Sequence, residues 1–132
     1  MKKRHNITSE RGQTMTEFAI ILPLLVVLLF GIIQFGIAFN NYVTLTDAAR
    51  AGARKGAVSR QSGNPAGDCK AAVLAAANNL DQSVLSPRVQ CISSWTAGSD
   101  LEVDASYPYN ITLFGLPVFS GDLKTVMKER VE

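Results

Sequence analysis

A single carboxylate, Glu17, stands directly in front of a long apolar run, and its position points to charge-pair chemistry. Residues 18–39 carry no charged side chain, so Glu17 lies where a helix would enter lipid. A charged side chain costs about 2.5–3.5 kcal/mol at mid-bilayer, less near the interface, and usually has a partner. If the chain is cut after Gly12, the new amino group of Gln13 lies four residues from Glu17. That spacing is one helical turn, so the ammonium and the carboxylate could neutralise each other within or between subunits.

Two cysteines and one histidine are the other residues whose types could do chemistry. Cys69 and Cys91 form no C-x-x-C pair, so zinc or thioredoxin-like chemistry is poorly supported. In an oxidising compartment a structural disulfide worth about 3 kcal/mol is the simplest expectation, with two free buried thiols as the alternative. His5 lies among the first twelve residues, and a form without them has no histidine for a catalytic triad or a metal site. No nucleophile–base pair is recognisable, and we expect no enzyme activity, metal or cofactor.

The element that positions Glu17 is the apolar run over residues 18–39. As a helix it would be roughly 33 Å long, enough to cross a hydrocarbon core of about 30 Å. A buried soluble helix is rarely so long and so apolar on every side. A secretory signal would have a shorter apolar core of about 7–15 residues, and residues 37–40 make a poor cleavage site after it. We therefore expect a membrane span.

Three kinds of residue within the span could affect how helices pack. Pro23 cannot donate to the carbonyl of Ala19 and should loosen or kink the first turns. Gly31 and Gly36 could allow close helix approach, although their spacing is not that of the G-x-x-x-G dimer motif. Gln34 could hydrogen-bond a neighbouring helix. Each of them could equally be a tolerated membrane residue.

The helix is expected to continue beyond the span, so that the N-terminal helix covers residues 13–58. Ala48, Gly52 and Gly56 are four residues apart and form a seam of small side chains on one helix face. Such a seam lets another element approach the backbone closely. The protein's own globular domain is the favoured occupant, and another subunit is the alternative.

The remaining residues, 59–132, predict a small domain that follows a turn-rich segment over residues 59–68. A second helix is expected over residues 69–80 with Asp68 as its N-cap. Residues 88–95 and 101–107 read as an antiparallel hairpin, interrupted at Pro108, with a possible third strand over residues 110–114. Residues 123–131 fit a strand or a helix, and we choose a strand. The expected fold class is α+β, with an antiparallel sheet and one helix beyond the long N-terminal one.

Charge separates the first twelve residues from the rest. Residues 1–12 contain four of the basic residues and one acidic residue, and removing them would leave 9 of the 13 basic and 10 of the 11 acidic side chains. The remainder is near neutral and offers no basic face for nucleic acid. Residues 1–12 resemble the n-region of a targeting segment, and their positive charge favours a cytoplasmic N-terminus. Three basic residues beyond the span, Arg50, Arg54 and Lys55, weaken that rule, but they lie further from the lipid.

The residues around Glu17 resemble a known processing site. The pattern G-x-x-x-x-E-F before an apolar helix is similar to the cleavage site of type IV prepilins, which a prepilin peptidase cuts after the glycine. More narrowly, about a third of the chain resembles TadE-like proteins, the pseudopilins of the tight-adherence (Tad/Flp) pilus system. The matching positions are Arg11, Gly12, Glu17, Phe18, Ala19, Pro23, Gly31, Phe35, Gly36, Ala48, Ala49, Arg50, Ala53 and Arg54.

This resemblance implies a minor pilin or pseudopilin with a pilin-like architecture, processed between Gly12 and Gln13. Glu17 and Phe18 would take part in recognition and assembly. The implied partners are the prepilin peptidase, other pilin subunits, the inner-membrane assembly platform and membrane lipid. The implied location is the bacterial inner membrane, with the C-terminal domain outside the cytoplasm. The alternative is an uncleaved, single-span anchored module whose exported domain recognises a ligand.

Overall fold

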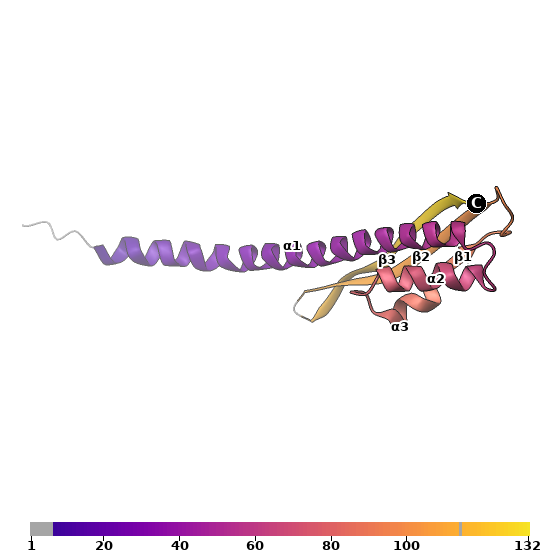
Figure 1. Ribbon diagram of the computed structural model, residues 1–132. Coiled ribbons are helices and arrows are strands. Elements are labelled where there is room, and N and C mark those ends of the chain that lie inside the picture. Colours follow the sequence, from indigo (N-terminus) through magenta and orange to yellow (C-terminus); the bar gives the residue numbers. More distant parts are fainter. Residues whose placement is uncertain (1–6, 114) are drawn as a thin grey trace, which may run out of the picture.

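The computed structural model describes residues 7–113 and 115–132, with side chains from residue 12 onward. One very long helix projects far beyond a small α+β domain (Figure 1). In chain order the elements are α1 (Ile7–Val58), α2 (Pro65–Ala76), α3 (Gln82–Leu85), a 3₁₀ turn (Ser86–Arg88), β1 (Val89–Ile92), β2 (Asp100–Leu113) and β3 (Leu116–Arg130). The expected α+β class is confirmed.

Helix α1 is a single helix of 52 residues that ends at Val58, where the sequence predicts its end. It stays helical through Pro23, so this proline does not end the helix. The helix begins at Ile7, upstream of Gly12, and the expected leader boundary therefore falls inside α1. Residues 1–6 of that leader lie outside the described residues.

The sheet has three antiparallel strands in the order β1-β2-β3. Pairing of Val89 with Ala105 and of Cys91 with Val103 confirms the hairpin, and residues 123–130 belong to β3 as expected. The interruption predicted at Pro108 is wrong, because β2 continues to Leu113. Strand β1 pairs with β2 only as far as Ala105, so at Pro108 the only neighbouring strand of β2 is β3. A proline, which lacks the backbone N–H, is tolerated in such a strand with one free edge.

The third strand expected over residues 110–114 is the end of β2, and Phe114 itself lies outside the described residues. Gly115, with φ +81°, adopts the left-handed conformation that lets the chain turn back into β3.

Helix α2 begins and ends four residues before the predicted boundaries. Asn64 is the N-cap in place of Asp68, because its side chain accepts a hydrogen bond of 3.0 Å from the Gly67 amide and Pro65 occupies the first turn. Asp68 lies in the first turn, where its negative charge suits the helix dipole.

Helix α3 was not expected. Its N-cap is Asp81, which accepts hydrogen bonds from the hydroxyl and the amide of Ser83. These bonds hold the pKa of the Asp81 carboxyl below its usual range, and the bond from the Ser83 hydroxyl has the largest effect.

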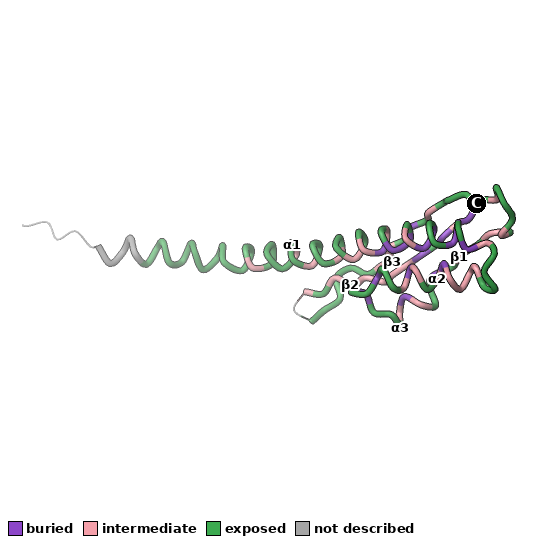
Figure 2. Tube along the Cα trace, viewed as in Figure 1, coloured by how far each residue is buried: buried purple, intermediate pink, exposed green. Residues whose placement is uncertain are grey.

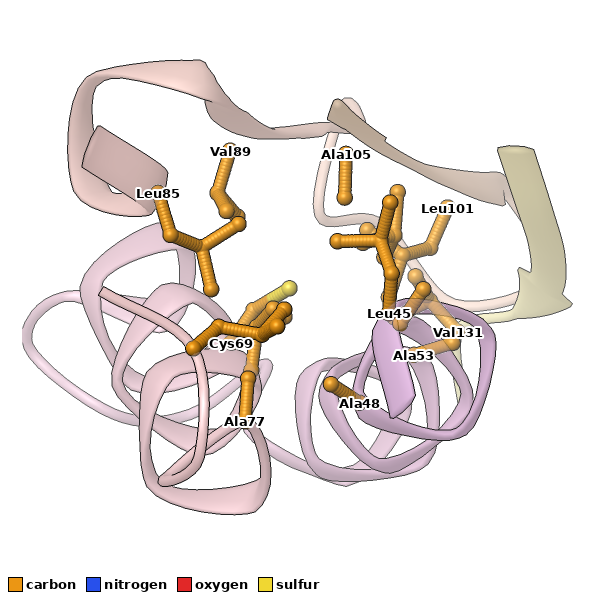
Figure 3. Packing of buried hydrophobic residues seen from close by; sticks show 14 residues of the cluster. Leu45, Ala48, Ala53, Cys69, Ala77, Leu85, Val89, Leu101, Ala105 and Val131 are labelled. Atoms are coloured by element: carbon orange, nitrogen blue, oxygen red, sulfur yellow. The ribbon is translucent and has the colours of Figure 1, made fainter. Parts of the chain in front are cut away.

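The core lies between one face of the sheet and the helices α1 and α2 (Figure 3). Leu101, Val103 and Ala105 alternate along β2 and are fully buried, which confirms the face predicted for that strand. The opposite face is polar, with an ion pair of 3.0 Å between Lys128 and Glu102. Among the residues whose burial is described, the buried ones lie from Leu45 onward, in the C-terminal part of α1 and in the domain, and residues 12–40 of α1 are mostly exposed (Figure 2).

Candidate functional site: the N-terminal helix

The apolar part of α1, residues 18–39, exposes large apolar side chains along its length. Its most apolar 18-residue window has a mean hydropathy of 2.8 and is 0% buried. Phe18 is 60% exposed, and most of the large side chains up to Phe39 are exposed as well. Leaving this much apolar surface in water would cost about 25 cal/mol for each Å². The helix is therefore compatible with a membrane anchor.

Two residues of the expected processing site, Gln13 and Glu17, lie on one face of α1. The Nε2 of Gln13 donates a hydrogen bond of 3.1 Å to the Oε1 of Glu17, one turn further along. The hydroxyl of Thr16 donates to the carbonyl of Gly12 at 2.9 Å. A Cβ at Gly12 would meet no atom within 4 Å, so packing within the described residues does not require a glycine there.

The two glycines of the span have no packing role within the described part of the chain. A Cβ at Gly31 or Gly36 would meet no atom within 4 Å. Gln34, between them, is half-buried. Any close helix contact at these residues would have to come from another molecule, and this remains a prediction.

The seam at Ala48, Gly52 and Gly56 faces the chain's own domain. Ala48 is fully buried. A Cβ at Gly52 would overlap the Cγ2 of Val73 and lie 3.1 Å from the carbonyl oxygen of Cys69. A Cβ at Gly56 would lie 2.6 Å from a methyl group of Leu101. The favoured occupant of the seam, the domain itself, therefore fills it.

A disulfide joins Cys69 of α2 to Cys91 of β1, with their Cα atoms 6.4 Å apart. Cys69 is fully buried against α1, so the bond links the helix layer to the sheet layer. Within residues 7–113 and 115–132, no group of three or more His, Cys, Asp or Glu side chains is placed to hold a metal ion.

Sequence reasoning missed one feature, an apolar groove of about 310 Å³ between the end of the span and the β2–β3 hairpin. It is lined by Phe35, Ala38, Phe39 and Tyr42 from α1 and by Tyr109, Ile111, Phe119 and Leu123 from the hairpin. The signal that could have found it is the absence of any charged residue between Asp104 and Asp122.

The structure is a long exposed apolar helix that continues into a small disulfide-linked α+β domain. Residues 12–54 match the family model described as TadE-like protein, and this match confirms the family resemblance expected from the sequence. The matched segment begins at Gly12 and ends at Arg54, so it includes Glu17, the apolar run and part of the seam. No curated protein and no solved structure matches the chain at a significant level.

Proposed function

We propose that this protein is a minor pilin or pseudopilin of a Tad/Flp-type pilus that is cut by a prepilin peptidase after Gly12. Its role would be in pilus assembly or priming, through association of apolar helices in the membrane. The observation that carries the proposal is the family match, which starts at Gly12 and contains Glu17 on a helix with an exposed apolar surface. Flp-type major pilins, by resemblance, lack a domain of this size, which favours a minor role.

The charge pair follows from the spacing on α1. Before the cut, the Gln13 side chain already reaches Glu17 at 3.1 Å, so residues at these positions meet on one helix face. The cut turns the backbone nitrogen of Gln13 into an ammonium and places Glu17 near a new helix N-terminus, where the helix dipole favours a negative charge. The neutralised end then enters lipid, or docks on a neighbouring subunit, at a lower cost than a lone carboxylate.

The proposed topology has the N-terminus in the cytoplasm of a bacterium and the domain on the outer side of the inner membrane. The basic residues before Gly12 support this orientation, as does the disulfide, which persists in oxidising compartments. The partners would be the prepilin peptidase, other pilin subunits and the assembly platform. We propose no catalytic activity and no cofactor.

The N-terminal residue of the protein isolated from membranes tests this proposal. Mass spectrometry should find Gln13 at the N-terminus, and Gly12→Val should leave the N-terminus uncut. The matched control is Gly31→Val, because an added side chain meets open space at both glycines and only the first adjoins the cut. An intact Met1 in the wild-type protein would contradict the proposal and favour the uncleaved, single-span binding module.

A further inference from the structure

The β2–β3 hairpin extends well beyond the rest of the sheet. Strand β1 pairs only with residues 102–105 of β2, whereas β2 and β3 pair with each other to the turn at Gly115. The distal part of the hairpin, residues 109–113 and 115–121, is therefore a two-stranded ribbon and is called the distal hairpin. It points back along α1 toward the apolar half of that helix (Figure 1).

The distal hairpin is uncharged and exposes large apolar side chains. No charged residue occurs between Asp104 and Asp122. Leu116 is 71% exposed, and Val118 and Phe119 are each 60% exposed. The first charged residue after the distal hairpin along β3 is Asp122, which forms an ion pair of 3.0 Å with Arg88. An exposed apolar tip of this kind is unusual on a surface that faces only water.

The distal hairpin lies at the same level along α1 as the end of the apolar run. Ile111 and Phe119 are paired across the two strands, and they line one groove together with Phe35 and Phe39. Phe35 and Phe39 belong to the uncharged residues 18–39, which lie within the candidate membrane-spanning helix. If α1 crosses a membrane, the hairpin side chains in the groove are at the depth where the helix leaves the lipid.

We propose that the distal hairpin dips into the membrane leaflet from which the domain emerges, and that lipid acyl chains fill the groove between it and α1. This inference rests on the membrane insertion of α1 within the proposed function. Lipid is the occupant because the groove continues directly from the lipid-facing surface of the helix. The lining side chains are apolar apart from two tyrosines, so the groove offers nothing to a charged partner.

The depth of the hairpin is limited by its backbone. The free edges of a two-stranded ribbon carry unpaired N–H and C=O groups, which are not tolerated in the hydrocarbon core. The backbone therefore stays in the interfacial layer, which adds about 10–15 Å in total to a core of about 30 Å. Tyr42 and Tyr109 line the groove and take the headgroup level that tyrosine prefers. The side chains of Leu116 and Phe119 reach into the acyl region, so the domain is held at two points.

Tryptophan fluorescence in vesicles tests this placement, because the chain has a single tryptophan, Trp95. Phe119→Trp in a Trp95→Phe background is reconstituted, as the full chain, into phosphatidylcholine–phosphatidylglycerol vesicles with or without bromine on the acyl chains. Emission from residue 119 should shift to shorter wavelength and lose intensity in the brominated vesicles. Leu116→Trp in the same background is a second probe in case the first variant does not fold.

Two controls carry a tryptophan outside the proposed contact. The first control is Val126→Trp in the same background, at an exposed position of β3 that lies after Asp122 and outside the distal hairpin. The second control is the wild type, whose single tryptophan, Trp95, lies in the loop after β1. Neither should lose intensity in brominated vesicles. Flotation of each sample with its vesicles shows separately whether α1 anchors the protein, and a protein that does not float would overturn both the anchor and this inference.

Two results with floating protein would overturn the hairpin placement alone. In the first, Phe119→Trp and Leu116→Trp are quenched by acrylamide in the water and not by bromine, so the hairpin is in solvent. In the second, both probes are shielded from both quenchers, and the shielding grows with the protein-to-lipid ratio. The groove would then be occupied by a second copy of the chain instead of lipid.

Discussion

Gly52 and Gly56 show how a single missing side chain sets the distance between α1 and the domain. The nearest atoms to a Cβ at these positions belong to α2 and to Leu101 of β2, and some of them are backbone or buried side-chain atoms that cannot move freely. Gly31 and Gly36 on the same helix meet nothing. Packing therefore requires a glycine at positions 52 and 56 near the C-terminal end of α1, whereas it does not require one at positions 31 and 36.

Gly52→Ala should destabilise the domain by about 1–3 kcal/mol, the usual cost of forcing extra volume into a packed core. The added methyl would overlap Val73, and the carbonyl of Cys69 lies 3.1 Å from it. The free energy of unfolding of the detergent-solubilised full chain, followed by near-ultraviolet circular dichroism, measures this loss. Gly31→Ala is the matched control and should leave the domain's unfolding unchanged. Equal stability of both variants would show that the seam is not tightly packed.

Helix α1 combines two surfaces in a single element of 52 residues. Its first half exposes large apolar side chains, and its second half presents small ones to α2 and β2. At 1.5 Å per residue it is roughly 78 Å long, so it can reach across a membrane and still form one side of the domain core. The disulfide then holds together the two layers that rest on it.

Replacing both cysteines, as Cys69→Ala with Cys91→Ala, should cost about 3 kcal/mol of domain stability on the chain-entropy account. The bond closes a loop with a sequence separation of 22 and joins α2 to β1. Denaturant unfolding of the full chain in detergent, with and without reductant, measures the effect. Reductant should lower the midpoint of the wild type and leave that of the double variant unchanged. An unchanged wild-type midpoint would show that the bond contributes little.

Charge is unevenly distributed over the whole molecule. Residues 18–39 are uncharged, whereas the residues that follow them in α1 and in the domain include acidic and basic side chains. Among the charged residues, Glu17 directly adjoins the apolar run. Its proposed partner exists only after proteolysis, which would couple processing to assembly.

Glu17→Ala should abolish surface filaments while the protein still enters the membrane, because only the charge pair is lost and the apolar run is intact. Electron microscopy of cells measures the filaments, and fractionation measures insertion. Met15→Ala is a control on the same turn; it shortens an exposed apolar side chain, leaves the Glu17 carboxylate in place and should keep filaments. Normal filaments in Glu17→Ala would contradict the charge-pair mechanism.

Several features were predictable because they depend on local periodicity. The alternation of Leu101, Val103 and Ala105 identified the buried face of β2 without any tertiary information. The start of α2 was missed although Asn64 and Pro65 are a recognisable N-cap and first-turn pair. Helix α3 was missed because four residues are too few to show a helical period.

The long apolar helix, the end of α1 at Val58 and the buried face of β2 follow from the sequence alone, because each depends on side chains close to one another along the chain. The tertiary structure alone decided that β2 continues through Pro108, because a proline is tolerated there only where the neighbouring strand has ended. It also decided that the domain fills the Gly52–Gly56 seam, and that the distal hairpin lies beside Phe35 and Phe39. These contacts join residues that lie more than ten positions apart, and no local pattern of the chain encodes which segments meet.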